Sequence, residues 1–140
     1  MKTIAVANQK GGVGKTTITR ELSACCALRG FQTLAIDCDP QGNLTTSWVE
    51  SDVYEATLSH VLIEPESPTG VKVEPLPLDD AIVESPVENL DIVPADMVLV
   101  QIAETARAST SPYMLDLIRR ALHRTPAILF PLLSLSPLKF

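Results

Sequence analysis

The sequence predicts an α/β fold with a mostly parallel sheet, and three observations point to it. The chain has 140 residues, the size of one ordinary domain, and 46% hydrophobic content is enough for a real core. A short apolar run at residues 3–7 breaks directly into a cluster of glycines, and a helical pattern follows. A second apolar run then ends at Asp37. Strand, glycine loop, helix and strand in this order form one βαβ unit, the opening of an α/β sheet.

Residues 3–7 are expected to form a buried parallel strand, because the run is short, apolar and leads into the glycine loop. From Lys15 the apolar residues recur at spacings of three and four, which predicts a helix that Gly30 is well placed to end. Residues 33–36 are a second buried-strand candidate. The apolar positions of the predicted helix are Ile18, Leu22, Cys25 or Cys26, and Leu28.

The middle of the chain is less regular. Residues 56–63 are compatible with a short helix, and the prolines of 65–77 predict a loop or an irregular edge. Residues 90–93 are a short strand candidate before Pro94. Asp96 could cap a helix that runs to about Arg107, although the apolar run 97–102 leaves this assignment open. Ser111 and Pro112 predict the start of a further helix.

The last sixteen residues, TPAILFPLLSLSPLKF, differ in character from the rest. They contain no acidic residue and carry prolines at 126, 131 and 137. Proline removes a backbone donor and fixes φ, so no long central strand or helix is expected through the whole stretch. Residues 125–140 are therefore predicted to form an aberrant apolar tail.

Charge and cysteine usage narrow the function classes. A formal charge of −6 and a pI near 4.8 argue against binding DNA or anionic membrane by bulk charge, although a small basic patch remains open. The three cysteines have neither zinc-site spacing nor the number for a disulfide framework, so buried free thiols in a reducing compartment are expected. The sequence shows no signal-peptide pattern and no run of ~20 apolar residues, which predicts a cytoplasmic chain.

The stretch NQKGGVGKTT, residues 8–17, carries the clearest chemistry. Glycines without a Cβ let the backbone turn tightly and direct N–H groups at phosphate oxygens, and the following helix adds its positive end. Lys15 would reach the β- and γ-phosphates, and the Thr16 hydroxyl would ligate Mg²⁺. A tight turn without a ligand is the alternative interpretation. The residues predicted to bind ATP are Gly11, Gly12, Val13, Gly14, Lys15, Thr16 and Thr17.

Two features of this loop depart from the pattern G-x-x-x-x-G-K-[ST]. Gln9 stands where the first glycine belongs, and an additional lysine, Lys10, follows it.

A second motif, DCDPQGN at residues 37–43, follows the second predicted strand. Loops after parallel strands leave the same edge of the sheet, so Asp37 and Asp39 are expected near the phosphates. Carboxylates beside a nucleotide can hold Mg²⁺ through water or orient an attacking water. An acidic turn with a helix cap is the structural alternative.

Together the two motifs resemble the ParA/Soj family of partition ATPases, in the MinD/ParA class of deviant phosphate-loop proteins. KGGVGKTT matches from Lys10 to Thr17, and the D-x-D-P-Q-G-N pattern matches from Asp37 to Asn43. Residues 78–95, LDDAIVESPVENLDIVPA, and the later LIRRAL are also similar. The resemblance covers residues 1–124, which implies the N-terminal part of a ParA-like ATPase domain, an incomplete three-layer P-loop NTPase fold.

The resemblance implies a role for each motif residue. Lys10 would reach across a nucleotide-sandwiched homodimer to the partner's phosphates, which couples hydrolysis to dimerisation. Lys15 would bind phosphate in cis, Asp39 would help to position the attacking water, and Lys10, Lys15 and Asp39 are thus the expected catalytic residues. Thr16 would hold Mg²⁺, Asp37 would support the metal shell and the loop, and the DPQGN loop would sense the γ-phosphate.

The same resemblance implies a function in plasmid or chromosome partitioning. The expected cofactors are ATP and Mg²⁺, and the expected partners are a ParB-like stimulator and nonspecific DNA. The chain would be associated with the nucleoid, and no membrane partner is expected.

The pattern departs from the family after residue 124. Family members continue like Y-D-Y-I-I-I-D-x-P-P-S, a strand that ends in a metal-serving aspartate, whereas this sequence has no aspartate after Asp116 and stops at about half the usual length. A frameshift or truncation is the favoured expectation over a genuine short protein. The alternative function is thus a non-catalytic remnant that binds nucleotide weakly or not at all.

Overall fold

The computed structural model describes residues 3–8, 10–50, 54–62, 74–108 and 130–135. Its elements follow the chain as strands, α-helices and two short 3₁₀ helices, η1 and η2. They are β1 (Ile4–Ala7), α1 (Lys15–Leu28), β2 (Thr33–Asp37), η1 (Thr45–Ser47), α2 (Leu58–Leu62), η2 (Leu78–Ala81), β3 (Val83–Glu84), β4 (Leu90–Val93), α3 (Leu99–Ala108) and β5 (Phe130–Leu135).

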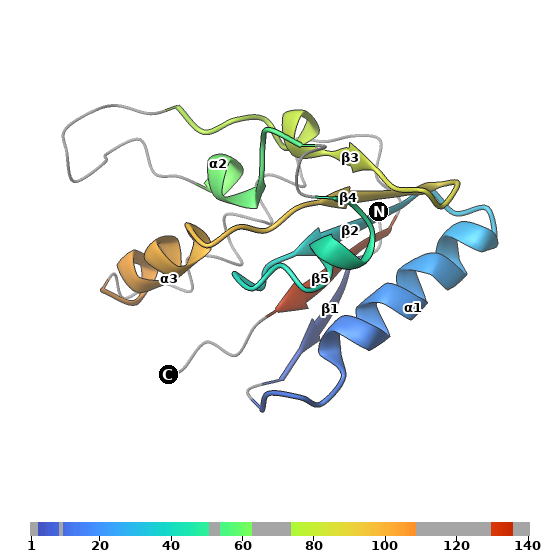
Figure 1. The fold of residues 1–140 in the computed structure, drawn as a ribbon, viewed down its shortest axis with the longest axis horizontal. Helices are drawn as coiled ribbons and strands as arrows, with labels where there is room; N and C mark the ends of the chain where they lie inside the picture. The colour runs from blue at the N-terminus through green and yellow to red at the C-terminus, as the bar shows by residue number, and fades with distance from the viewer. Residues whose placement is uncertain (1–2, 9, 51–53, 63–73, 109–129, 136–140) are drawn as a thin grey trace.

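The strands form one sheet in the order β1-β5-β2-β4-β3. All neighbours are parallel except β3, which pairs antiparallel with β4. The carboxyl ends of β1, β5, β2 and β4 therefore lie at one edge of the sheet (Figure 1). The mostly parallel α/β sheet is thus confirmed.

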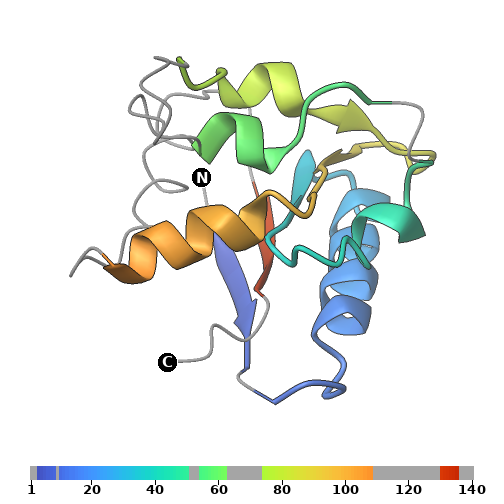
Figure 2. The same cartoon turned by 60° about the vertical axis from the view of Figure 1, so that its left-hand side comes forward.

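Helices cover both faces of the sheet. On one face, α2, η2 and α3 bury a core cluster with Leu34, Ile36 and Val93. On the other face, Ala27 of α1 and Leu44, just before η1, pack with Ala35 and Ile92. Figure 2 shows α1 on one side of the strands and α2 and α3 on the other. Alternation along β2 produces this division, because successive side chains of a strand point to opposite faces.

The last sixteen residues contain a short central strand that the sequence did not predict. β5 lies between β1 and β2 and pairs in parallel with both. Pro131 is its second residue, and the pairing with β1 begins only at Leu132. A proline at the start of a strand removes a donor where one neighbour has not yet begun to pair, which explains why it is tolerated here.

Small residues, and not the apolar positions that predicted the helix, form the buried face of α1. The helix turns Thr19, Ser23 and Ala27 toward the sheet, and all three are buried, whereas Ile18 is 53% and Leu28 79% exposed. The buried hydroxyls donate to carbonyls one turn back, Thr19 to Lys15 and Ser23 to Thr19, which satisfies them inside the core. Small side chains let the helix lie close to the strands.

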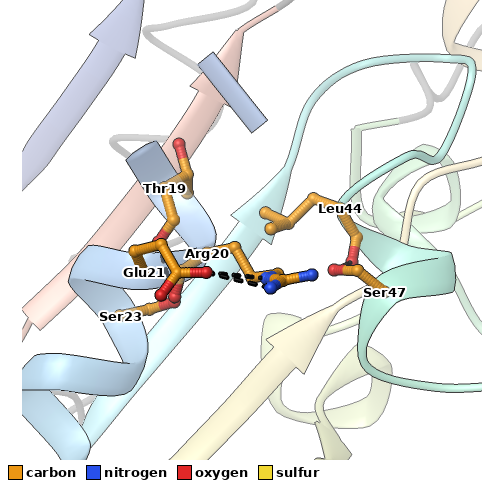
Figure 3. Close-up of polar contacts among 6 residues, drawn as sticks. All are labelled: Thr19, Arg20, Glu21, Ser23, Leu44 and Ser47. Atoms are coloured by element: carbon orange, nitrogen blue, oxygen red, sulfur yellow. Dashed lines mark hydrogen bonds and ion pairs between the residues drawn. The ribbon is translucent and has the colours of Figure 1, made fainter. Parts of the chain in front are cut away.

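Beside its buried face, α1 directs a charged residue toward the segment around η1. Arg20 extends from α1 toward Ser47 and is held by Glu21, with Nη2 2.9 Å from Oε1 (Figure 3). Both side chains of this ion pair are about half exposed, so the pair contributes little to stability.

Strand β1 was expected to be buried, yet three of its four residues are exposed. It is the edge strand of the described sheet and pairs with β5 alone, which leaves its outer side open.

Other sequence predictions are confirmed. Gly30 has φ +83° and its N–H bonds to Ala27 O, as at a helix end. Residues 56–63 contain α2, and β4 occupies 90–93. Asp96 Oδ1 accepts the N–H of Val98 and caps α3, which settles the assignment left open there. The helix predicted from Ser111 and most of the 65–77 loop lie outside the described residues.

Candidate functional site

Both sequence motifs lie at the carboxyl edge of the sheet, on either side of β5. The loop 8–14 follows β1, and the DCDPQGN loop begins at the last residue of β2 (Figure 1). Ser134 of β5 is paired with Val6 on one side and with Asp37 on the other. Because neighbouring strands are ~4.8 Å apart, the two loops start about 10 Å from each other at the level of the backbone. The prediction that the two motifs leave the same edge of the sheet is confirmed for the backbone.

The glycine loop has the backbone that its sequence predicts. Gly14, the N-cap of α1, has φ +86°, in the left-handed region that favours glycine. A Cβ built at Gly11, Gly12 or Gly14 would meet no atom within 4 Å. The surface of the loop is therefore open rather than packed against the fold, which is the condition for admitting a ligand.

The two lysines of the loop make different contacts. Nζ of Lys15 donates to the main-chain carbonyl of Lys10 at 3.2 Å, so the Lys15 ammonium lies back over the loop. The backbone N–H of Lys10 donates to Asn8 Oδ1 at 2.9 Å. The peptide groups on both sides of Lys10 are thus held, while its side chain is exposed. Among the described residues, no acidic side chain forms an ion pair with either lysine.

The N-terminus of α1 completes this positive region. The first turn of a helix has N–H groups without partners inside the helix, and here neither a side-chain cap nor an acidic residue satisfies them. Lys15, Thr16 and Thr17 belong to that turn. An open glycine loop, an uncapped helix end and the Lys15 ammonium fit a phosphate chain, because these donors converge on one small region.

Asp37 is fully buried and fully engaged in hydrogen bonds. Its Oδ1 accepts the N–H of Asp39 at 3.0 Å, and its Oδ2 accepts the N–H and the hydroxyl of Thr45, each at 2.9 Å. Burial raises the pKa of this carboxyl, and the bonds from Thr45 and Asp39 counteract part of that rise. In this arrangement Asp37 holds the loop, and its predicted role in the metal shell stays a prediction.

Asp39 lies further out on the same loop and is half-buried. Its Oδ1 accepts the N–H of Gln41 at 3.0 Å, and its carbonyl accepts the N–H of Gly42 at 2.8 Å. These bonds form a turn in which Gly42 has φ +63°. No hydrogen bond from a described residue reaches the second oxygen of Asp39, and its predicted role in positioning an attacking water stays a prediction.

Cys38 points the other way, into the core under α2 and α3. Its thiol is buried, and burial together with the neighbouring carboxylates raises its pKa. Cys25 is exposed and Cys26 half-buried, so only Cys38 meets the expectation of a buried free thiol.

Two residues of this site were not identified from the sequence. Asn8 orients the backbone of Lys10, and Thr45 joins Asp37 to the end of β4 by accepting the N–H of Ala95 at 3.0 Å. An asparagine two residues before a loop lysine is a recognisable turn signal. Nothing in the sequence separates Thr45 from the neighbouring hydroxyls of Thr46 and Ser47.

Known proteins resemble the chain along most of its length. The AAA domain family matches residues 1–124. The sporulation initiation inhibitor protein Soj of Bacillus subtilis is 39% identical over 99 residues, which are 70% of this chain and 35% of that protein. The chromosome partitioning protein ParA of Caulobacter vibrioides is 35% identical over 113 residues, which are 78% of this chain and 39% of that protein.

Solved structures extend the likeness to the fold. Cobyrinic acid a,c-diamide synthase from Mycobacterium smegmatis, with a bound ATP analog and magnesium, matches with TM-score 0.78 and 27% identity over 98% of this chain and 52% of that one. The apo McdA of Cyanothece matches with TM-score 0.74 and 25% identity over 98% of this chain and 50% of that one. The described helices and strands thus share the fold of phosphate-loop NTPases.

The chain spans 35% and 39% of the length of the two curated relatives named above, and about half the length of these solved neighbours. Within the described part of the chain, no helix combines the length and apolar character needed to cross a membrane.

Proposed function

This chain belongs to the AAA domain family of ParA/Soj-type partition ATPases, and from that premise we propose that its loop from Lys10 to Thr17 binds Mg-ATP as part of a partitioning protein. The observation that carries the proposal is the open, uncapped N-terminus of α1 with the Lys15 ammonium folded over the glycine loop. Among the described residues, the Lys15 ammonium has the Lys10 carbonyl as its hydrogen-bond acceptor, and no side chain caps the N-terminus of α1.

Lys15 is placed to exchange its contact with the Lys10 carbonyl for phosphate oxygens. A lysine that already lies over the loop needs to move only its terminal atoms to reach a bound phosphate. The N–H groups of the first turn of α1 bind the same oxygens, and the helix dipole favours their negative charge.

Thr16 is proposed to hold the Mg²⁺, and Asp39 is proposed to help position the attacking water. Thr16 contributes its hydroxyl from the first turn of α1, and Asp39 contributes the carboxylate oxygen that accepts no hydrogen bond from the described residues. When bound, Mg²⁺ neutralises phosphate charge. Asp37 is buried and accepts hydrogen bonds on both oxygens, and one of these bonds holds the backbone N–H of Asp39.

Lys10 is proposed to act on a second copy of the chain. Its backbone is held from both sides while its side chain is exposed, an arrangement that presents the ammonium outward. A fixed cation supplied from one subunit to the phosphates of the other stabilises the charge that develops in hydrolysis. We propose, as part of the same function, that the chain dimerises, associates with DNA and is stimulated by a ParB-like partner.

A second candidate function is nucleotide binding without turnover. Its basis is β5, which lies between the two loops but has no aspartate in FPLLSL, nor anywhere later in the sequence. The resembled family ends this strand in an aspartate that serves the metal. A loop that binds Mg-ATP beside a strand without that carboxylate would hold nucleotide and hydrolyse it slowly or not at all.

A titration with a fluorescent ATP analogue in Mg²⁺ tests the common part of both candidates. Wild type is expected to bind, and Lys15→Ala is expected to weaken binding by a factor on the order of ten or more, since bonds from a charged donor are lost. Equal binding by the two proteins would contradict a working loop. Steady-state phosphate release that Lys10→Ala abolishes would support the ATPase, whereas retained binding without release would support the second candidate.

A further inference from the structure

We infer that Thr45 is the positioning residue of the Asp39 loop: one threonine fastens the far end of segment 38–44 both to Asp37 and to the end of β4. The inference rests on the proposed nucleotide site and adds to it a residue that acts through Asp39 rather than on the nucleotide itself.

The geometry of Thr45 is that of a clamp with three bonds. Its N–H and its hydroxyl both donate to Asp37 Oδ2 at 2.9 Å, and its Oγ1 accepts the N–H of Ala95 at 3.0 Å. Thr45 is 1% exposed, so water does not compete for these bonds. The hydroxyl is used as donor and acceptor at once, which no aliphatic side chain of the same size can reproduce.

Asp37 closes the clamp from the other end of the loop. Its Oδ1 accepts the N–H of Asp39, while its Oδ2 receives both donors of Thr45. One buried carboxylate therefore joins the residue where the loop begins to the residue where it ends. Asp37 thus closes segment 39–45 into a ring: the N–H of Asp39 is bonded at one end and Thr45 at the other, with Gln41 between them.

Apart from a weak contact of Gln41 Nε2 with the sulfur of Met97 at 3.8 Å, the remaining hydrogen bonds of the loop are local. Gln41 and Gly42 bond back to Asp39, and the Thr46 hydroxyl donates to the carbonyl of Gly42 at 3.1 Å. These bonds shape the turn, but none of them attaches it to another strand. Thr46 is exposed, carries the same side chain one residue away and is a matched control.

The clamp also connects the loop to the start of α3. Ala95, which donates to Thr45, is followed by Asp96, whose Oδ1 caps α3 at Val98. Asp96 Oδ2 accepts the hydroxyls of Thr57 and Ser59 at the start of α2. A displacement of the Asp39 loop by a γ-phosphate is thereby resisted by two further helices, so the position of Asp39 is set before nucleotide binds.

Amide hydrogen exchange on the whole chain, without nucleotide, tests the clamp directly. In wild type the amides of Thr45 and Ala95 are expected to be protected like those of β2, although neither lies in a strand. Thr45→Val, which keeps the shape and removes the hydroxyl, is expected to lose protection across 38–46 by a factor on the order of ten. Thr45→Ser and the control Thr46→Val should keep it, and α1 should not change.

Titrations with fluorescent ATP and ADP analogues in Mg²⁺ then test the positioning. Thr45→Val is expected to bind the ADP analogue like wild type and to lose a factor on the order of ten in its preference for the ATP analogue, with recovery in Thr45→Ser. Wild-type amides of Thr45 or Ala95 that exchange like an exposed loop would overturn the clamp, even if Thr45→Val does not fold. A normal preference for ATP in a folded Thr45→Val protein would overturn the positioning role.

The two proposals fail in different ways. Wild type that shows the protected amides but binds neither analogue would overturn the nucleotide site, and with it the role of Thr45 toward phosphate, while leaving the hydrogen-bonded clamp in place.

Discussion

The ammonium of Lys15 lies 3.2 Å from the main-chain carbonyl of Lys10, so the two lysines of the glycine loop meet through one side chain and one backbone group. Lys10 contributes only its peptide groups to the loop, because Asn8 holds its N–H and Lys15 holds its carbonyl. The side chain of Lys10 is therefore available for a second molecule, while that of Lys15 serves its own loop.

A first prediction separates the two lysines. Lys10→Ala keeps both backbone contacts, so its free energy of unfolding is expected to stay within about 0.5 kcal/mol of wild type. Its affinity for a fluorescent ATP analogue at protein concentrations that keep the chain monomeric should also be unchanged. A tenfold loss of monomer affinity in Lys10→Ala would mean that Lys10 contacts phosphate in cis.

A second prediction concerns the pH dependence that Asp37 imposes. Burial raises the pKa of Asp37 in the fold above the ordinary value of 3.8, so the folded state holds this proton more tightly than the unfolded state. The free energy of unfolding should therefore fall as pH rises from about 3.8 through the raised folded pKa, and then level off.

Asp37→Asn provides the reference for that measurement. Urea unfolding of wild type and variant between pH 3 and pH 7 gives a stability difference in which the other carboxylates cancel. The free energy of unfolding of wild type minus that of Asp37→Asn should decrease as pH rises from about 3.8 through the raised folded pKa of Asp37. A difference that moves in the opposite direction would mean that the bonds from Thr45 and Asp39 outweigh desolvation.

A third prediction concerns Gly42, which has φ +63° in the turn after Asp39. A Cβ there would meet its nearest neighbours, Ala95 O and Thr45 Cβ, only at 3.9 Å, so the cost of Gly42→Ala comes from the backbone and not from a clash. We expect a loss of about 1–2 kcal/mol in the free energy of unfolding.

Gly11→Ala is the matched control for Gly42→Ala, since its φ lies outside the left-handed region and a Cβ would meet nothing within 4 Å. Its stability in urea unfolding should remain close to that of wild type. Equal losses in the two variants would contradict the left-handed conformation of Gly42.

A fourth prediction uses the three thiols. Cys25 is exposed, Cys26 is half-buried, and Cys38 is buried with a raised pKa. A thiolate reagent at pH 8 should modify Cys25 fastest and Cys38 only as the protein unfolds, because a buried thiol with a raised pKa supplies little thiolate. Mass spectrometry of the modified peptides checks the order, and early modification of Cys38 would contradict its burial.

The sequence predicts the part of the fold in which local pattern and tertiary packing agree. Residues 34–36 are apolar, and all of β2 is buried. The positive φ of Gly12 and Gly14 could likewise be expected from the sequence, because few other residues accept this conformation. The edge at which both motifs meet followed from parallel pairing alone.

The errors arose where packing overrides the local signal. Hydrophobic spacing predicted the helix α1, but Ile18 and Leu28 are exposed, and the small residues Thr19, Ser23 and Ala27 face the sheet. Pro131 made a strand at this position unexpected. The strand β5 nevertheless forms, and it tolerates Pro131 because the pairing with β1 begins only at the next residue. The bond between Thr45 and Ala95 joins residues fifty positions apart, which no local pattern encodes.

The measurement that tests the central claim most directly is thermal unfolding of the chain with and without Mg-ATP. A ligand that binds only the folded state stabilises it by about 2.7 kcal/mol at a hundred times its Kd, so saturating Mg-ATP should raise the Tm of wild type by several degrees. Lys15→Ala should show no rise at the same concentration. An unchanged Tm for wild type, or an equal rise in both proteins, would contradict nucleotide binding by the loop from Lys10 to Thr17.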